Sequence, residues 1–410
     1  MIEVRVHHEL SELDPAAMEK VNASSNSASL FSSPTWLKYF LAHDPSFKER
    51  GATPWLLAAW EGGVLKGYLA LKRVLERGGP VLSSLISLEV ERPGVVAAPE
   101  DLARVSQAFF RVLLGRASEW DLLEFFQQDA GSPLFHGPAE LTGRHWLRRL
   151  PDRNSNVLAL PFSDLAAYAA SLSKNMRHST KKQLKGLLAS PGLTLLTAKN
   201  PAGCSALFEV FLDIERRSWK VRVGATVGER EALYRAAFAD PSVETVACIA
   251  SLDGLPMAGS IWVHYGRNTY HLQTIYSEAH EGLAPGTLMM VVTLADALER
   301  KSEAFDMLPD FSHYKARWGT RTIETQWVQI FRVGSQRHLR AVAGDFWRRV
   351  KPKPADDATR GKNPYKVAAG TSSVEVPADR PRLAALLAQA RAAGAIEQDA
   401  AALSARNPFS

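Results

Sequence analysis

Residues 245–263 read TVACIASLDGLPMAGSIWV, and this stretch decides the fold. Two apolar runs flank the pair Asp253-Gly254, which is a strong sequence signal for a two-residue hairpin turn. A further glycine, Gly259, follows within the second run. The stretch therefore predicts two strands joined by a tight turn.

Residues 55–71, WLLAAWEGGVLKGYLAL, repeat this design in the first half of the chain. Glu61-Gly62 matches the later turn pair, and Gly67 matches the later glycine at the same offset. A second match follows in the same order, between residues 120–123 (WDLL) and 305–308 (FDML), each after a helical pattern. We therefore expect a duplication, in which each half holds a hairpin, a helix and another strand in an α/β or α+β arrangement.

The remaining patterns predict three parts, namely a first domain over 1–150, a second over 151–350 and a tail over 351–410. Residues 336–350 have the pattern of a basic amphipathic helix. The tail begins as a solvated linker rich in Pro, Gly, Ser, Asp and Lys. Its Ala-rich stretch 383–403 can form a helix, docked or free, and we expect no catalytic role for it.

Composition is that of an ordinary globular protein, with 410 residues, 46% hydrophobic, 22% charged and a formal net charge of +6. Cys204 and Cys248 are too few for a disulfide framework and have no metal-ligand spacing, so we expect reduced thiols and no metal. The first residues lack the apolar core of a signal peptide, and the longest apolar stretch, 288–298, is too short to span a bilayer. We expect a cytoplasmic protein.

Residues 283–287 (LAPGT) open a long apolar helix. A helix N-terminus presents unpaired N–H groups and a partial positive charge, which suits a phosphate, and no acid occurs between Glu281 and Asp296. The matching helix of the first half begins with residues 99–101 (PED), whose carboxylates are expected to satisfy its N-terminus. We therefore expect only the second half to bind a phosphate-bearing ligand.

Further motifs in the second half support a family resemblance. They are residues 173–178 (SKNMRH), 218–220 (SWK), 253–254 (DG), 284–288 (APGTL), 305–306 (FD) and 314–319 (YKARWG). With them, residues 150–335 resemble the GNAT superfamily of acyl-CoA transferases, and more closely its bacterial branch of cellulose-biosynthesis-type acetyltransferases. The tandem arrangement also resembles the Fem-type transferases, which are two GNAT-like units in one chain.

The resemblance implies tandem GNAT-like domains, with mixed, mostly antiparallel sheets flanked by helices. It also implies acetyl-CoA or a longer acyl-CoA as co-substrate, without a metal or a covalent enzyme intermediate. The donor would lie on residues at the helix start: Ala284, Pro285, Gly286, Thr287 and Leu288. A backbone N–H on the preceding strand, around residues 271–276, would polarise the thioester carbonyl.

Candidate reactive groups lie near these segments. As general base we consider Asp306, His271 and His313, although Asp306 could be structural, as its match Asp121 warns, and His271 could be a plain half-buried histidine. As the acid for the leaving thiolate we expect Tyr314 first and Tyr276 second, and either could instead be a core tyrosine. The residues expected to contact the substrate are Trp219, Lys315, Trp318, Arg177 and His313, with a core role open for both tryptophans.

The leading hypothesis is an acyl-CoA-dependent N- or O-acyltransferase. Its acceptor would be an amino or hydroxy sugar of an envelope polysaccharide precursor, or a long-chain amine such as a sphingoid base. The alternatives are a Fem-like aminoacyl-tRNA-dependent peptide transferase and a catalytically silent GNAT-fold scaffold. The acyl length, the acceptor and the oligomeric state stay open.

The cations of residues 174–185 could contact the 3′-phosphate of coenzyme A, an acidic acceptor or anionic lipid at the inner membrane surface, or form a solvated face. We expect no binding to nucleic acid, because the cations form one cluster without interleaved aromatic residues.

Overall fold

The computed structural model describes residues 2–25, 29–48, 51–85, 92–137, 143–222, 224, 226–309, 313–350, 379–393 and 396–398. The chain folds into two compact units. Unit 1 contains residues 1–155, 309–311 and 323–364, and unit 2 contains residues 156–308, 312–322 and 365–410.

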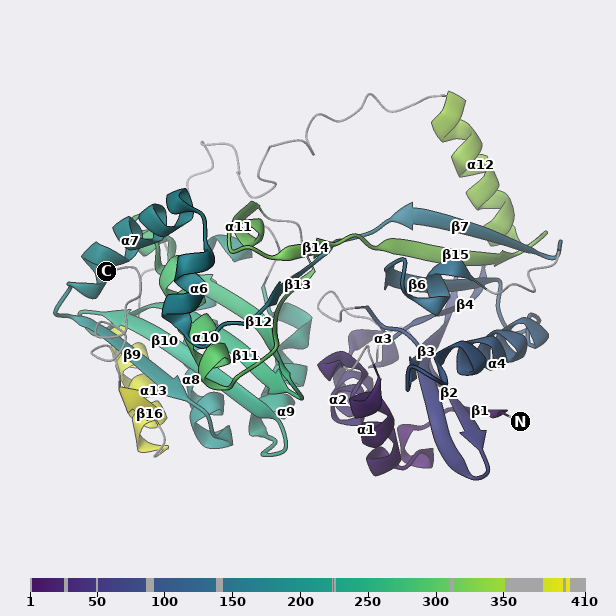
Figure 1. The fold of residues 1–410 in the computed structure, drawn as a ribbon, viewed down its shortest axis with the longest axis horizontal. Coiled ribbons are helices and arrows are strands. Elements are labelled where there is room, and N and C mark those ends of the chain that lie inside the picture. The colour runs from purple at the N-terminus through teal and green to yellow at the C-terminus, as the bar shows by residue number, and fades with distance from the viewer. Residues whose placement is uncertain are drawn as a thin grey trace. The chain divides into compact units, whose positions relative to one another are not determined.

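Unit 1 is built on one sheet with the strand order β1-β2-β3-β4-β6-β15-β7, in which β5 pairs with β3 (Figure 1). Neighbouring strands are antiparallel except for β4 and β6, which are parallel. Its helices and strands are β1 (Glu3–His7), η1 (Leu10–Glu12), α1 (Pro15–Ser24), η2 (Leu30–Ser32), α2 (Pro34–His43), α3 (Pro45–Lys48), β2 (Thr53–Glu61), β3 (Val64–Glu76), β4 (Gly79–Ser84), β5 (Val96–Ala97), α4 (Leu102–Gly115), β6 (Leu122–Gln128), α5 (Pro133–His136), β7 (His145–Pro151), β15 (Gln326–Arg332) and α12 (Gln336–Val350).

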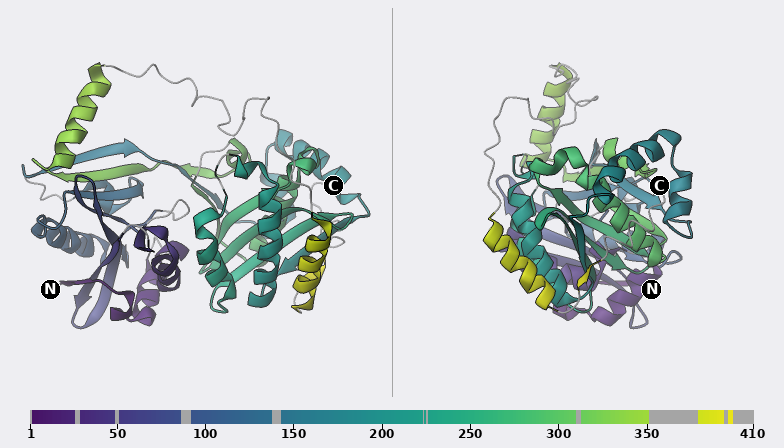
Figure 2. Two further views of the ribbon diagram at one scale, coloured as in Figure 1. Left: turned by 180° about the vertical axis from the view of Figure 1, so that it is seen from behind. Right: turned by 90° about the vertical axis from the view of Figure 1, so that its left-hand side faces the viewer.

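Unit 2 contains a second sheet, with the order β14-β8-β13-β12-β11-β10-β9-β16. Helices α6, α7 and α10 cover one face and α8, α9 and α13 the other (Figures 1 and 2). Its elements are β8 (Ser155–Ala159), α6 (Leu165–Ser171), α7 (Lys174–Leu188), β9 (Leu193–Ala198), α8 (Pro201–Arg216), η3 (Trp219–Val221), η4 (Gly228–Arg230), α9 (Glu231–Ala239), β10 (Glu244–Leu252), β11 (Leu255–Tyr265), β12 (Asn268–Tyr276), η5 (Glu278–Leu283), α10 (Pro285–Glu299), β13 (Ala304–Pro309), α11 (His313–Ala316), β14 (Arg321–Ile323), α13 (Arg380–Ala392) and β16 (Ile396–Gln398).

The two units share one order of elements. In each, a strand and then helices precede a hairpin, and a third antiparallel strand is followed by a helix and a parallel strand: β1 to β6 in unit 1 and β9 to β13 in unit 2. The expected fold class, with two related units and mostly antiparallel sheets flanked by helices, is thereby confirmed.

The hairpin turns show why these stretches fold alike. The two central turn residues have positive φ in both hairpins: Gly62 and Gly63 in the first, Asp253 and Gly254 in the second. Such turns follow the right-handed twist of the strands, and glycine adopts positive φ without a Cβ clash. The structure thus aligns Gly62-Gly63 with the later turn, so the sequence match through Glu61-Gly62 is wrong by one residue.

The match between Asp121 and Asp306 is also shifted. In β6, residues 122–124 pair with the preceding parallel strand, and in β13 residues 304–306 do so. Asp306 therefore lies inside its parallel ladder, whereas Asp121 lies just before the first paired residue of β6. Asp121 instead forms an ion pair with Arg332. A structural role of Asp121 is therefore no argument about Asp306.

Residues 323–350 pack differently from the expected domain division. β15 pairs with β6 on one side and β7 on the other, and α12 follows it, so both belong to unit 1 rather than to the second half. The unit to which these residues belong is set by hydrogen bonds between strands that are far apart in the sequence. Short-range sequence patterns do not predict such pairing.

The C-terminal helix is docked. In α13, Leu383, Leu387 and Ala390 are buried, and the helix packs on α8. β16 then pairs with β9 at the sheet edge. The linker expected after Lys351 lies outside the described residues up to residue 378.

Two local features of unit 2 concern its cysteines and the start of α7. Cys204 and Cys248 are buried and free, as expected. Helix α7 begins at Lys174, because Ser173 caps it by accepting the N–H of Met176 at 3.2 Å.

We predict that Gly67→Ala destabilises unit 1 by about 1–3 kcal/mol, because a core without room must shift to admit a methyl group. A Cβ at Gly67 would lie 2.7 Å from Val105 Cγ1 and 2.8 Å from the carbonyl oxygen of Val96. Thermal and urea unfolding of the purified variant measure this loss.

The control is Gly115→Ala at the last residue of α4, where an added Cβ meets nothing within 4 Å. It should be neutral or stabilising by up to about 1 kcal/mol. Equal stability of the two variants would contradict the close approach at Gly67.

Candidate active site

The parallel strands β12 and β13 part halfway along their length. Residues 268–270 of β12 pair with residues 304–306 of β13, and the pairing ends there. On the opposite edge of β12, the pairing with β11 shifts register between Ile261 and Trp262, which leaves Leu272 as an extra residue in β12. Ligands of α/β sheets bind at such carboxyl ends of parallel strands. The segments that follow β12 and β13 supply most of the expected site residues.

The start of α10 follows β12 and has no side-chain cap. Ala284, the N-cap residue, has φ 53° and ψ 47°, and no side chain accepts a hydrogen bond from the first turn. Pro285 occupies the first helical position, and no acid occurs in the first turn. The first-turn N–H groups of Gly286 and Leu288 therefore remain for an anion, as the sequence predicts.

Two phenols lie at this helix start. The hydroxyl of Tyr314, in α11, donates to the carbonyl oxygen of Gly286 at 3.0 Å. The ring of Tyr276, at the end of β12, lies about 3.6 Å from the position that a Cβ at Gly286 would take. Tyr276 and Tyr314, the two candidate acids, therefore both lie at the start of α10, where the donor is expected, although one ends β12 and the other follows β13.

The surroundings keep both phenols protonated. Burial raises the pKa of Tyr276, the charge of Glu281 raises it further, and a hydrogen bond from Trp219 partly offsets this. Burial likewise raises the pKa of Tyr314, even though 38% of this residue is exposed. Tryptophan donates only, so the Tyr276 oxygen accepts from the indole of Trp219.

His271 lies in a buried polar network beneath α10. Its Nε2 is 2.9 Å from Ser260 Oγ and 2.6 Å from Thr274 Oγ1, and its ring stacks on Phe305 at 5.5 Å. Burial lowers its pKa to about 3, and the charges of Lys315 and Lys220 act in the same direction. His271 is therefore neutral near pH 7 and a weak base.

Asp306 shapes the end of β13. Its Oδ1 accepts the N–H of Leu308 at 2.9 Å, and Leu308 has a left-handed φ of 62°. Lys315 donates from Nζ to the carbonyl oxygens of Met307 at 2.7 Å and Leu308 at 3.1 Å. The carboxylate and the ammonium thus hold one backbone turn where the strands part, and such strained turns are common at functional sites.

Two further expected contact residues hydrogen-bond to α6 rather than to the start of α10, and a third is only partly described. Trp318 is fully buried in the core, and its carbonyl accepts from Tyr168 at 2.8 Å. Arg177 is exposed and donates to the carbonyl oxygen of Ala170 at 2.6 Å. The side chain of His313 lies outside the described residues, while its backbone begins α11.

Sequence reasoning did not assign Lys220 and Gln183 to the site. Lys220 donates to Gln273 of β12, and its position beside Trp219 in the SWK motif was the available signal. Gln183 of α7 accepts from Thr287 Oγ1 at 3.0 Å. No sequence pattern announced Gln183, because the contact joins residues far apart in the chain.

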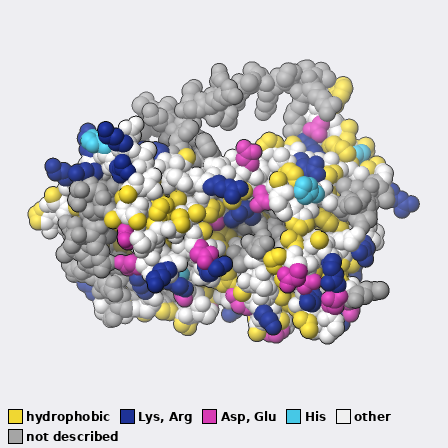
Figure 3. Space-filling model, in the orientation of Figure 1, with side chains coloured by type: hydrophobic (Ala, Val, Ile, Leu, Met, Phe, Trp, Pro, Cys, Tyr) yellow, Lys and Arg dark blue, Asp and Glu magenta, His cyan; other side chains and the backbone are white. Residues whose placement is uncertain are grey.

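The Gln183 contact brings α7 to the first turn of α10. Figure 3 shows cationic side chains gathered over α7. The exposed ones are Lys174, Arg177, His178 (when protonated), Lys181, Lys182 and Lys185. Arg317, after α11, donates to Ser179 Oγ of α7 at 3.3 Å. A helix rich in exposed cations therefore contacts the first turn of α10, which itself favours an anion.

The matching helix start in unit 1 differs in charge. Asp101 is the N-cap residue of α4, but its side chain makes no capping hydrogen bond. Its carboxylate instead pairs with Lys66 and Arg104, each at 3.2 Å. The expectation that this acid satisfies the N–H groups directly is wrong, yet a carboxylate at that position still opposes a phosphate.

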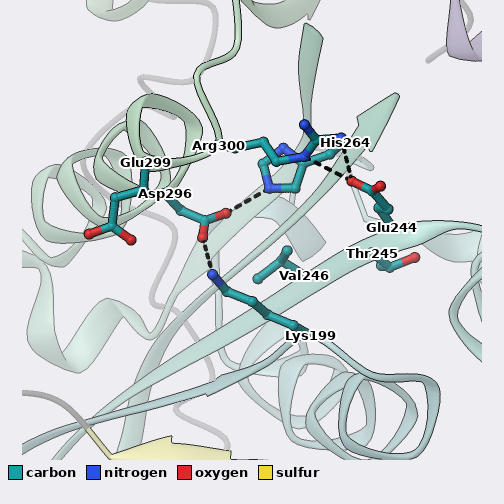
Figure 4. A pocket seen from close by; sticks show the side chains of 8 residues that line it. All are labelled: Lys199, Glu244, Thr245, Val246, His264, Asp296, Glu299 and Arg300. Carbon is teal, nitrogen blue, oxygen red and sulfur yellow. Dashed lines mark hydrogen bonds and ion pairs between the residues drawn. The ribbon is translucent and has the colours of Figure 1, made fainter. Parts of the chain in front are cut away.

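A pocket at the other end of α10 contains a buried ionic network, shown in Figure 4. Asp296 accepts hydrogen bonds from Trp262 Nε1 at 2.7 Å and His264 Nε2 at 2.8 Å, and pairs with Lys199 at 2.6 Å. Burial opposes its charge, but the hydrogen bonds from His264 and Lys199 outweigh burial and bring its pKa to about 2. The network fastens the last turn of α10 to the sheet.

The described ranges contain no group of three or more His, Cys, Asp or Glu side chains that could hold a metal ion. Among these residues no helix is both long and apolar enough to cross a lipid bilayer.

Comparison with known proteins shows what residues 174–316 and the fold are similar to. Residues 174–316 match the family described as an acetyltransferase (GNAT) domain. No curated protein matches the sequence. The solved structure titled "Crystal structure of FemX" is similar at 12% identity with a TM-score of 0.55, covering 79% of this chain and 96% of that one. A conserved protein of unknown function from Bacteroides thetaiotaomicron is similar at 10% identity and a TM-score of 0.51, covering 81% and 100%.

Residues 174–316 are thus similar to a GNAT acetyltransferase domain, and the chain has a fold similar to that of FemX. At such low identity the solved structures support the fold alone. The assignment to the cellulose-biosynthesis-type branch stays a prediction.

We predict that Asp296→Asn reduces the loss of unfolding free energy that the wild type shows as the pH falls from 5 to 2. The folded-state pKa of about 2 lies below the ordinary 3.8, so this carboxylate contributes stability above about pH 4 that is lost as the pH falls toward 2. The difference corresponds to about 2 kcal/mol. Urea unfolding between pH 5 and 2, followed by tryptophan fluorescence, should show that loss in the wild type and not in the variant.

Glu303→Gln is the control, because Glu303 pairs with Arg267 at the surface and both side chains are more than half exposed. Its effect should stay below about 1 kcal/mol. If Asp296→Asn loses as much stability as the wild type between pH 5 and 2, the lowered pKa of Asp296 does not stabilise the folded protein.

Proposed function

We propose that unit 2 binds an acyl-CoA at the start of α10 and transfers its acyl group to an amine or hydroxyl. The observation that carries this proposal is the uncapped first turn of α10, which meets two protonated phenols where β12 and β13 part. The GNAT match over residues 174–316 supports the reaction class.

The diphosphate of the donor would accept from the first-turn N–H groups of α10. Gly286 offers room there, since even an added Cβ would meet only the Tyr276 ring at ordinary contact distance. The cations of α7, joined to this turn through Gln183 and Thr287, would face the donor's remaining phosphate. The positive charge of this region supports a donor that carries several phosphates.

In the transfer step the acceptor's lone pair attacks the thioester carbonyl carbon, and the C–S bond then breaks. The carbonyl oxygen would be polarised by backbone N–H groups of β12 beyond Tyr270, where pairing with β13 has ended. The acceptor loses one proton and the leaving thiolate gains one. No covalent intermediate with the enzyme is required.

The hydrogen bonds favour Tyr276 over Tyr314 as the proton donor. The Tyr314 proton points to the Gly286 carbonyl oxygen, so it is already engaged. Tyr276 accepts from Trp219 and keeps its own proton for a ligand. We assign Tyr276 as the acid and Tyr314 as the residue that positions the helix start.

As the general base that takes the acceptor's proton, we propose Asp306 in preference to His271. The low pKa of His271 and the two hydroxyls on its Nε2 leave it little basicity. Asp306 lies where the strands part, next to the turn that Lys315 holds. An amino or hydroxy sugar and a long-chain amine such as a sphingoid base are the acceptors to assay first.

We predict that Gly286→Asp abolishes coenzyme A binding with little effect on folding. A carboxylate in the first turn repels the diphosphate, while the same charge interacts favourably with the helix dipole, so the unliganded melting temperature should stay level or rise slightly. Thermal-shift titration with coenzyme A, acetyl-CoA and a long-chain acyl-CoA measures both effects.

Gly286→Ala is the matched control, because its Cβ meets only the Tyr276 ring at about 3.6 Å. It should keep most of the ligand-induced shift. If the wild type responds to none of the three ligands, the donor assignment is wrong and a scaffold role gains support. A response to aminoacyl-tRNA alone would favour a Fem-like transferase.

We further predict that Tyr276→Phe lowers kcat by about 100-fold or more with little change in the KM for acyl-CoA, because the leaving thiolate loses its proton source. Tyr314→Phe should instead raise that KM, since it releases the Gly286 carbonyl oxygen. Steady-state kinetics of both variants test the two roles. A lower kcat in Tyr314→Phe with a higher KM in Tyr276→Phe would exchange the two roles. Unchanged kinetics in both variants would show that neither tyrosine has the role we assign to it.

A further inference from the structure

Helix α12 of unit 1 is docked through its polar side. Arg337 pairs with Glu76 at 2.9 Å and donates to the carbonyl oxygen of Gly79. Further along, Asp345 pairs with Arg148 at 2.5 Å. Ion pairs thus fix both ends of this contact.

Between these ion pairs the contact is small and partly apolar. The ring of His338 lies against Trp146 at 5.4 Å. Ala341 packs on the cluster of Val81, Leu122 and Phe331. Because residues 337, 338, 341 and 345 share one side of a helix, this side faces the sheet.

The opposite side of α12 is apolar and exposed. Leu339 is 59% exposed, Val342 44%, Phe346 61% and Trp347 58%. Spacings of three, four, seven and eight residues place these side chains on one face. Globular proteins normally bury such a face, and burying each of these side chains would be worth about 1.5–3 kcal/mol. Exposed apolar clusters of this kind mark binding surfaces.

The sequence in and just after α12 is basic. Arg340 lies next to it and is exposed. Between Asp345 and Asp356 the sequence carries four cations, Arg348, Arg349, Lys351 and Lys353, and no acid. A second copy of the chain would bring the same cations together, whereas an anionic surface would pair with them.

We propose that α12 is a peripheral membrane helix, which inserts its exposed apolar face into the interface of an anionic lipid bilayer. Aromatic and aliphatic side chains beside cations are the composition that binds at this depth. Lysine and arginine near the surface add attraction to anionic lipid headgroups. This inference concerns unit 1 and does not depend on the acyl donor proposed for unit 2.

Vesicle co-sedimentation of the full chain tests the proposal. The wild type should pellet with vesicles of phosphatidylcholine mixed with phosphatidylglycerol, and much less with phosphatidylcholine alone. The variant Phe346→Ser/Trp347→Ser should partition about tenfold less or weaker still, because both aromatic anchors are lost. Arg340→Glu should weaken binding at low salt, and added salt should reduce its difference from the wild type.

The matched control is Val64→Ser/Leu75→Ser, which removes two other exposed apolar side chains of unit 1, 58% and 74% exposed. It should bind vesicles like the wild type. Circular dichroism should show that all variants are folded, as expected for surface substitutions.

Two outcomes would overturn the proposal. One is a wild type that stays in the supernatant with both kinds of vesicle, or that pellets no better than Phe346→Ser/Trp347→Ser. The other is a lipid-free dimer in analytical ultracentrifugation that this variant dissociates, which would assign the face to a second copy of the chain.

Discussion

The early end of the pairing between β12 and β13 is the constraint on which the site depends. A parallel pair needs a crossover connection, and α10 provides it between these two strands. The helix must then start near the end where the strands have parted. The buried hydrogen bond between Ser260 of the sheet and Thr293 of the helix, and the ion pair of Asp296 with Lys199 near the helix's far end, keep it there. An unsatisfied helix start, two phenols and a lysine-held turn therefore meet in one place.

The two units share one topology but differ in the charges at their equivalent helix starts. In unit 1 the carboxylate of Asp101 and its two cations occupy the helix start that is open in unit 2. On the far side of β6, unit 1 adds β15, whereas unit 2 places β8 beside β13. The fold alone does not decide function, because a few charges at equivalent positions change what each unit can hold.

Much of this arrangement could be predicted from local patterns. The hairpins, the open start of α10 and the bounds of α12 follow from turn residues, absent acids and helical periodicity. The pairing of β15 with β6 could not, since it depends on hydrogen bonds between distant segments. The same holds for the contact of Gln183 with Thr287. The shift between Asp121 and Asp306 was missed because short sequence matches do not fix strand register.

The position of β15 has a consequence for how the chain is made. β7 joins its sheet through β15, yet the whole of residues 156–308 is translated between them. While the ribosome synthesises unit 2, the sheet of unit 1 has an unfilled place beside β6. Unit 1 therefore cannot finish folding in the order of synthesis, and nascent chains that stop before residue 326 leave an open strand edge exposed to chaperones and to aggregation.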